Sequence, residues 1–185
     1  MTQQVVKEKM SFGDKFRNLP QDTVLVVGDS MARGIGCCLE RDSGLFSKLV
    51  YGGAKIEDIE QRLEVVGDKP GSHVVIVVGT NNLKREGSET ILKRYESLMD
   101  KMQKRRYRKV TFVEVMKRTD VGNFLNSRRL GLNMRLKRLC DSNGFGFVET
   151  GVLGEDLGAD GVHLNNTSQD KVARVIFQHC KVSLN

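Results

Sequence analysis

Short apolar runs that alternate with helix-spaced patterns are the feature that most limits what this chain can fold into. Three runs are continuous and rich in β-branched residues, as strands buried on both faces are: Thr23–Val27, Val74–Val78 and Val110–Val115. Leu49–Tyr51 and Phe145–Val148 are weaker strand candidates. Five strands alternating with helices predict an α/β fold, in which a parallel sheet is covered by helices on both faces, because right-handed crossovers leave few other topologies.

The segments between these runs carry apolar residues at helical spacing. Predicted helices cover residues 31–39, 56–66, 91–102, 132–140 and 172–180. Ahead of the last one, Thr167 and Asp170 have the spacing of a capping box.

Length and composition predict one folded unit. The chain has 185 residues, of which 39% are hydrophobic and 29% charged, which suits a single core. We expect the domain to span residues 23–185, preceded by a tether or short helix over residues 1–22. No run approaches the roughly 18 apolar residues of a membrane-spanning helix, and the polar start does not resemble a secretory signal, so we expect a cytoplasmic protein.

The sequence predicts neither a metal site nor a cofactor. The four cysteines show no Cys-x-x-Cys spacing, and we expect reduced, mostly buried thiols. Gly34 and Gly36 lie inside a predicted helix, too far from the preceding strand for a dinucleotide-binding turn.

Small and polar residues follow the predicted strands, at the edge where an open parallel sheet binds its ligands. Ser30 comes directly after the first strand and before a helix, a position that suits a nucleophile because the helix N-terminus is electropositive. Taken alone, such a serine is more often a helix N-cap. A serine nucleophile also needs a general base.

Three histidines are available as that base. His73 precedes a strand in a polar loop, and His179 lies on the apolar edge of the last helix as a packed or surface residue. His163 lies in the loop between the last strand and the last helix, three residues after Asp160, and Gly161 permits the turn that brings the carboxylate to the imidazole. Such an aspartate fixes the histidine tautomer and stabilises the imidazolium formed during attack.

An oxyanion hole would complete this chemistry. Candidate donors are the Ser30 N–H, the Gly53 N–H and the side-chain amide of Asn81, which follow three different strands. An Asn at the end of a strand is also a common turn residue, so Asn81 by itself indicates little.

Taken together, these segments resemble the conserved blocks of the SGNH (GDSL-type) hydrolases, in the same order over about residues 23–180: Gly28-Asp29-Ser30, Gly53, Gly79-Thr80-Asn81 and Asp160-Gly161-Val162-His163. The resemblance implies a flavodoxin-like three-layer α/β/α sandwich with strand order 2-1-3-4-5. It also implies a serine esterase that hydrolyses acyl or acetyl esters, of small molecules or lipids, through an acyl-enzyme. Ser30, Gly53, Asn81 and His163 would be the family's four named residues, with Asp160 completing the triad.

One position departs from the family pattern, and a second block has two candidate glycines. Asn82 stands where the third block usually has Asp, a residue with a mainly structural role, and Gly52 is an alternative to Gly53 in the second block. An α/β-hydrolase nucleophile elbow fits less well, because Ala32 breaks Gly-x-Ser-x-Gly and the acid lies three residues before the histidine.

The stretch over residues 117–140 resembles the esterase domain in the first-open-reading-frame protein of vertebrate LINE-type (non-LTR) retrotransposons. The net charge is +7, and the lysines and arginines are clustered. One cluster lies within residues 128–138. The candidate patch for an anionic partner is Lys104, Arg105, Arg106, Arg108 and Lys109. The alternative function is therefore an RNA- or anionic-membrane-binding module on an esterase-like fold, with contacts mostly to phosphates because aromatics are sparse.

Overall fold

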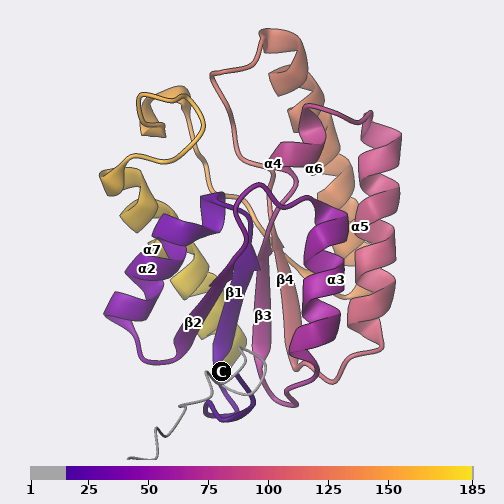
Figure 1. Ribbon diagram of the computed structural model, residues 1–185, viewed down its shortest axis with the longest axis vertical. Helices are drawn as coiled ribbons and strands as arrows, with labels where there is room; N and C mark the ends of the chain where they lie inside the picture. The colour runs from indigo at the N-terminus through magenta and orange to yellow at the C-terminus, as the bar shows by residue number, and fades with distance from the viewer. Residues whose placement is uncertain (1–15, 185) are drawn as a thin grey trace, which may run out of the picture.

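The computed structural model describes residues 16–184, with side chains to residue 181, as a twisted parallel sheet between two layers of helices (Figure 1). The five strands lie in the order β2-β1-β3-β4-β5 and all pair in parallel. Their bounds are β1 Val24–Gly28, β2 Phe46–Val50, β3 His73–Val77, β4 Lys109–Val113 and β5 Gly146–Val148. The predicted fold class and strand order are confirmed.

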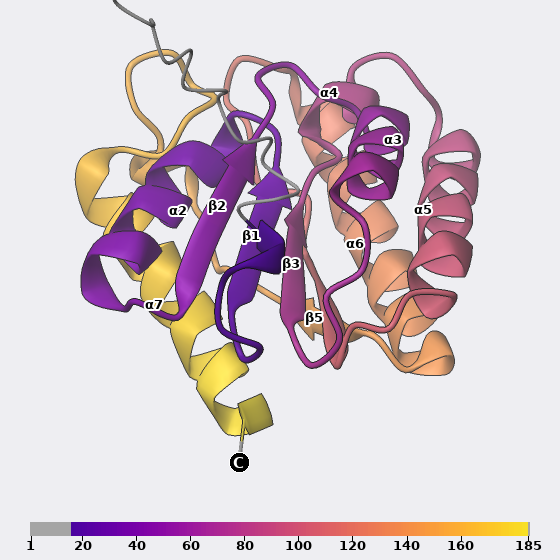
Figure 2. The ribbon, with the colours of Figure 1, turned by 60° about the horizontal axis from the view of Figure 1, so that its bottom comes forward.

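The helices cover both faces, and the strands alternate their side chains between two cores. The helices are α2 Met31–Asp42, α3 Ile56–Val66, α4 Thr80–Leu83, α5 Ser88–Gln103, α6 Asn123–Asn143 and α7 Asn166–Leu184. Helices α2 and α7 pack on one face of the sheet, and α3, α5 and α6 on the other (Figures 1 and 2). In β1, Leu25 and Val27 join the core under α3 and α5, whereas Val24 and Val26 join the core under α2 and α7.

Two short elements were not predicted. Helix α4 follows β3 directly, and a single 3-10 turn spans Gly154–Asp156 before α7. Elements of one turn have too few residues to show a period, so hydrophobic patterning cannot reveal them. Both belong to loops at the carboxyl edge of the sheet, where the candidate site lies.

His73 corrects one expectation. It is the first residue of β3 rather than part of a polar loop, and its side chain is completely buried. Its Nε2 atom lies 2.7 Å from Thr111 Oγ1, while burial, followed by the charges of Lys109 and His179, lowers its pKa to about 3. The polar residues before it suggested a loop, but the parallel pairing of β3 with β1 begins at His73.

The segment before β1 packs against the domain where it is described. Phe16 is fully buried in the core beneath α3 and α5, and Lys69 Nζ donates a hydrogen bond to the Arg17 carbonyl, 2.9 Å away. Residues 1–15 of the predicted tether or short helix over residues 1–22 lie outside the described residues. All four cysteines are free thiols, and of these only Cys37 is exposed.

Polar side chains hold the carboxyl edge together beyond the strand ends. Glu114 Oε1 accepts hydrogen bonds from the N–H and the hydroxyl of Thr150, at 2.7 and 2.6 Å, which ties the exit of β4 to that of β5. Asn133 on α6 bonds to both the N–H and the carbonyl of Val115. Because these backbone groups are satisfied internally, the loops leaving the sheet are fixed in position. Within the part of the chain described here, no helix is long and apolar enough to span a membrane.

Candidate active site

Three segments that are distant in sequence meet at the carboxyl edge of the sheet. Ser30 Oγ lies 2.9 Å from His163 Nε2, and His163 Nδ1 lies 2.6 Å from Asp160 Oδ2. This geometry fits a neutral imidazole that donates its Nδ1–H to the carboxylate and accepts the serine proton at Nε2. The predicted triad residues are therefore brought together in the order that base-assisted attack by a serine requires.

The loop that carries His163 is shaped by Asp160. The second oxygen of this carboxylate, Oδ1, accepts the backbone N–H groups of Val162 and His163, both at 2.9 Å. The hydrogen bond from His163, followed by these two N–H groups, lowers the pKa of Asp160 to about 2. The carboxylate is therefore ionised near neutral pH and anchored at three points.

Gly161 is the residue that makes this turn feasible. Its φ is +67°, and a Cβ at this position would lie 2.5 Å from Thr119 Oγ1 and 3.0 Å from the Asp120 nitrogen. The Thr119 N–H donates a 2.7 Å hydrogen bond to the Gly161 carbonyl. Any side chain here would push the histidine loop away from the segment that follows β4.

The end of the same loop caps α7. Asn165 Oδ1 accepts the N–H of Ser168 at 2.9 Å, so Asn165 is the N-cap, and the capping box predicted at Thr167 is wrong. Asp156 supports this junction, because its carboxylate accepts bonds from the Ser168 hydroxyl and the Leu153 N–H, while its carbonyl accepts the Asn165 N–H. Sequence reasoning missed both residues, which fix the position of the histidine loop relative to α7.

Ser30 lies on a tight turn between β1 and α2. The Asp29 N–H bonds to the Val77 carbonyl of the neighbouring strand, and Asp29 Oδ1 accepts the N–H of Met31 at 2.9 Å. Gly28 must lack a side chain here, because a Cβ would lie 2.0 Å from the Val77 carbonyl oxygen. The turn is therefore fixed by backbone contacts on both sides of the serine.

The three predicted oxyanion donors follow β1, β2 and β3 at this edge. Neither the Ser30 N–H nor the Gly53 N–H has an acceptor among the described residues, so both can serve a ligand. Asn81, on α4, donates one hydrogen of its amide to the Ala54 carbonyl at 2.9 Å, which leaves the other hydrogen of Nδ2 for a ligand. Gly53 has a φ of +74°, and Gly52 is not among the glycines with positive φ.

Asn82 occupies a structural position. It is completely buried, its Oδ1 accepts the N–H of Ile56 at 3.0 Å, and its amide nitrogen donates to Glu57 at 3.1 Å and to Glu86 at 3.0 Å. An amide suits this position because it provides donors for two carboxylates, where an aspartate would add a third negative charge. Asn82 thus links α3, α4 and the start of the segment that leads to α5.

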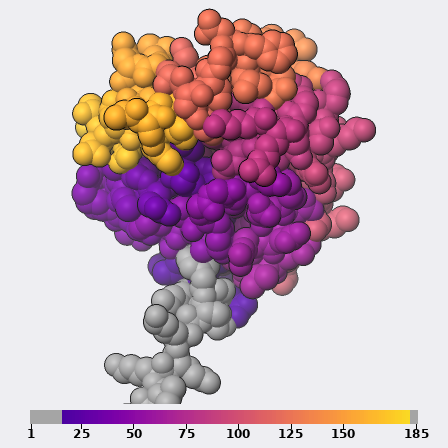
Figure 3. Space-filling view, turned by 45° about the horizontal axis from the view of Figure 1, so that its top comes forward, coloured from indigo at the N-terminus to yellow at the C-terminus, as the bar shows by residue number. Residues whose placement is uncertain are grey.

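A cavity of about 300 Å³ opens beside the serine. Figure 3 shows this edge of the molecule, where the histidine loop borders the beginning of α2. Residues from α2, the histidine loop and α7 line the cavity: Ser30, Met31, Arg33, Gly34, His163, Leu164 and Gln169. Its walls combine Ser30 and His163 with two apolar side chains and one arginine, Arg33, which sequence reasoning did not single out.

The candidate patch for an anionic partner lies at the other edge of the sheet. Its five residues run from the C-cap of α5 to the first residue of β4, before the strand rather than after it (Figure 1). Lys104, Arg106 and Arg108 are exposed, whereas Arg105 pairs with Asp68 at 3.5 Å. The second basic group, on α6, is largely used within the molecule: the buried Arg129 donates to the Val115 carbonyl, and Arg135 pairs with Glu89.

Among the described residues, no group of three or more histidine, cysteine, aspartate or glutamate side chains could hold a metal ion.

Comparison with known proteins relates the chain to solved esterase structures. No family model and no curated protein match it. A member of the lipolytic G-D-S-L family from Veillonella parvula superposes with a TM-score of 0.71 at 15% identity, covering 84% of this chain and 96% of that one. The psychrotrophic esterase EstA from a Pseudoalteromonas species gives 0.69 at 14% identity, covering 89% and 99%.

An acetylxylan esterase from Geobacillus stearothermophilus gives a TM-score of 0.68 at 13% identity, covering 86% of this chain and 94% of that one. At these identities the likeness concerns the fold. The chain therefore has the fold of the lipolytic G-D-S-L esterases over most of its length.

Proposed function

We propose that this protein is a serine esterase that hydrolyses carboxylic esters, with Ser30 as nucleophile, His163 as general base and Asp160 as its partner. The observation that carries the proposal is the pair of contacts at His163, 2.9 Å to the Ser30 hydroxyl and 2.6 Å to the Asp160 carboxylate. Serine is a poor nucleophile unless a base takes its proton, and this arrangement supplies one. The shared fold with several esterases supports the same conclusion.

In the first half of the reaction, His163 Nε2 takes the proton of Ser30 while Oγ attacks the ester carbonyl. The negative charge on the carbonyl oxygen is stabilised by the N–H groups of Ser30 and Gly53 and by the amide of Asn81. His163 then gives its proton to the departing alcohol, which leaves an acyl group on Ser30.

In the second half, water attacks the acyl-enzyme. His163 removes a proton from this water, a second oxyanion forms at the same donors, and the acid leaves as Ser30 recovers its proton. Asp160 stays ionised throughout and stabilises the imidazolium, in keeping with its low pKa.

Two measurements test the proposal. Hydrolysis of p-nitrophenyl acetate should fall by at least about 10³-fold in Ser30→Ala, as in other enzymes that lose a triad residue. Ser142→Ala is the matched control, because Ser142 is exposed near the end of α6, which leads into β5 at the edge of the sheet opposite Ser30. A fluorophosphonate probe should label Ser30, a chemistry related to that of the monoethylphosphonate that inhibits EstA in its structure. Equal hydrolysis by Ser30→Ala and wild type would rule out this mechanism.

Four finer points stay predictions. The retrotransposon setting depends on the resemblance of residues 117–140 alone. Binding of RNA or of an anionic membrane depends on the charge of the patch at the opposite edge of the sheet. The acyl chain, lipid or acetyl, and the cytoplasmic location are expectations from sequence.

A further inference from the structure

We propose that the ester hydrolysed at this site carries a second, anionic group, and that Arg33 binds it. This inference rests on the proposed esterase function and deepens it by naming the class of substrate. Two observations support it: Arg33 lines the cavity beside Ser30, and among the described residues no carboxylate pairs with Arg33.

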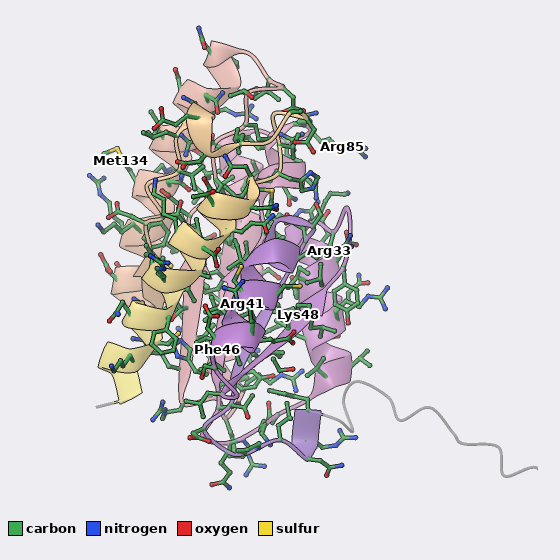
Figure 4. All side chains as sticks on the ribbon, turned by 90° about the vertical axis from the view of Figure 1, so that its left-hand side faces the viewer. Arg33, Arg41, Phe46, Lys48, Arg85 and Met134 are labelled. Carbon is green, nitrogen blue, oxygen red and sulfur yellow. The ribbon has the colours of Figure 1, made fainter. Side chains whose placement is uncertain are left out.

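Arg33 is placed to reach a ligand bound at the serine. It lies three residues after Ser30, on the first turn of α2, so the two side chains occupy the same side of the helix start. Side chains on a helix lean toward its N-terminus, which here is the end that carries Ser30. Figure 4 shows Arg33 at the upper end of α2, and it lines the same cavity as Ser30 and His163.

Several cations around this edge are paired with acids, and among the described residues Arg33 is not one of them. Lys84 and Arg118 both pair with Asp120, at 2.8 and 2.7 Å, and Arg94 pairs with Glu86 at 3.3 Å. Among the described residues, Arg33 makes no ion pair, and none of the cavity's lining residues carries a carboxylate. An arginine that lines a cavity without an acid nearby is available for an anion from solution.

The surrounding charges favour an anion in the same place. Helix α2 points its positive end at the cavity and has no acidic residue in its first turn. The acid just before this helix, Asp29, is buried, and its Oδ1 already accepts the Met31 N–H. The nearest acid of the triad, Asp160, already accepts hydrogen bonds from the N–H groups of Val162 and His163 as well as from the imidazole. Leu164 and Met31 supply apolar contacts for the carbon chain of the ester.

The experiment compares charged and neutral esters of matched size. The first pair places the charge on the acyl part: p-nitrophenyl hydrogen adipate against p-nitrophenyl hexanoate. The second pair places it on the alcohol part: 4-acetoxybenzoate against its methyl ester. For at least one pair, we expect wild type to have the higher kcat/KM on the charged ester. Arg33→Gln should reduce the ratio of kcat/KM for the charged ester to kcat/KM for the neutral ester by about tenfold.

Further variants separate the guanidinium from general electrostatics. Arg33→Lys should keep part of the preference, because it keeps the charge but loses the planar pair of donors. Arg174→Gln removes one positive charge from the exposed surface of α7, outside the cavity lining, and should leave the ratio within twofold of wild type. A thermal unfolding curve for each variant checks that the fold is retained.

The outcomes also distinguish the two proposals. If wild type hydrolyses the esters but Arg33→Gln leaves both ratios within twofold of wild type, the anionic substrate class is wrong and the esterase proposal stands. If the ratio falls equally in Arg174→Gln, the preference comes from net charge and the role of Arg33 is wrong. If wild type hydrolyses none of the four esters and Ser30 is not labelled by fluorophosphonate, both proposals are wrong.

Discussion

Asp29, next to the proposed nucleophile Ser30, is the most buried acid among the described residues. Its side chain is 1% exposed, Oδ1 accepts the Met31 N–H, and Oδ2 has no partner among the described residues. Burial raises its pKa to about 6, although the Met31 N–H and the charges of His163 and Arg118 lower it. A carboxyl group beside the serine therefore binds a proton more tightly in the folded chain than in the unfolded one.

This raised pKa predicts a specific dependence of stability on pH. Between pH 4 and 6 the folded state binds more protons at Asp29 than the unfolded state does, so this residue's contribution to stability is lost as the pH rises through that range. Asp29→Asn should remove the contribution, which changes by up to about 1.4 kcal/mol per pH unit. Urea unfolding of wild type and variant at pH 4.5 and 7.0 measures it.

The comparison between variant and wild type is needed because His73 acts in the opposite direction. Its lowered pKa means that the unfolded state binds more protons between about pH 3 and 6.5, so this contribution is lost as the pH falls. The difference between the two proteins cancels the histidine effect. A difference that is the same at both pH values would contradict the raised pKa of Asp29.

At the scale of elements, buried polar contacts set where the short helices lie. Asn82 connects α3 to α4 through the Ile56 N–H, and its amide contacts the carboxylates of Glu57 and Glu86. Arg94 on α5 pairs with Glu86 and approaches Glu57 at 3.9 Å, which offsets part of their charge. Because α4 also carries Asn81, this cluster determines where one of the proposed oxyanion donors lies.

Asn82→Asp, which introduces the residue usual in the SGNH hydrolases that the sequence resembles, should destabilise this protein. A third carboxylate would face Glu57 and Glu86 in a buried site and would lose two donated hydrogen bonds, a cost of about 1–3 kcal/mol. Chemical denaturation at pH 7 measures the loss.

A second substitution tests the cause. In the double variant Asn82→Asp with Glu86→Gln, residue 86 becomes the hydrogen-bond donor and residue 82 the acceptor. This variant should therefore be more stable than Asn82→Asp alone. Equal stability of Asn82→Asp and wild type would show that the carboxylates do not require the amide.

At the scale of the whole molecule, the sheet separates two surfaces of different character. The proposed triad and the cavity beside Ser30 lie at the carboxyl edge. Lys104, Arg106 and Arg108 lie where the chain enters β4, at the amino edge. The net charge of +7 does not identify which surface an anionic partner would use. The separation allows the two surfaces to be tested independently.

Charge reversal of Lys104, Arg106 and Arg108 to glutamate should weaken binding to RNA or to phosphatidylserine vesicles while leaving ester hydrolysis within about twofold of wild type. Hydrolysis should be unaffected because exposed charges separated by more than about 10 Å are largely screened at 0.1 M salt. Fluorescence anisotropy with a single-stranded RNA and vesicle co-sedimentation measure the binding. Unchanged binding to both partners would exclude this patch as a binding surface.

Much of the architecture could be predicted from sequence, and the limits of that prediction are specific. The β-branched runs and helical periods indicated all five strands and their neighbouring helices, because burial on one or both faces leaves a local, repeating signal. His73 was placed in a loop and the cap of α7 at Thr167, because a strand start and an N-cap depend on single contacts. Ser30, His163 and Asp160 could be nominated because parallel strands bring their carboxyl ends to one edge.

By itself, the sequence determined the order of elements, the two-sided burial of the sheet and the edge at which polar residues would gather, since all three follow from periodicity and chain order. Only the tertiary structure decided how these residues meet: the imidazole against the serine hydroxyl, Asn82 between two glutamates, Arg129 buried and Arg33 unpaired. The physical reason is that hydrogen bonds and ion pairs act over a few ångströms between segments as far apart as residues 30 and 163. No local pattern records which partner each side chain will find.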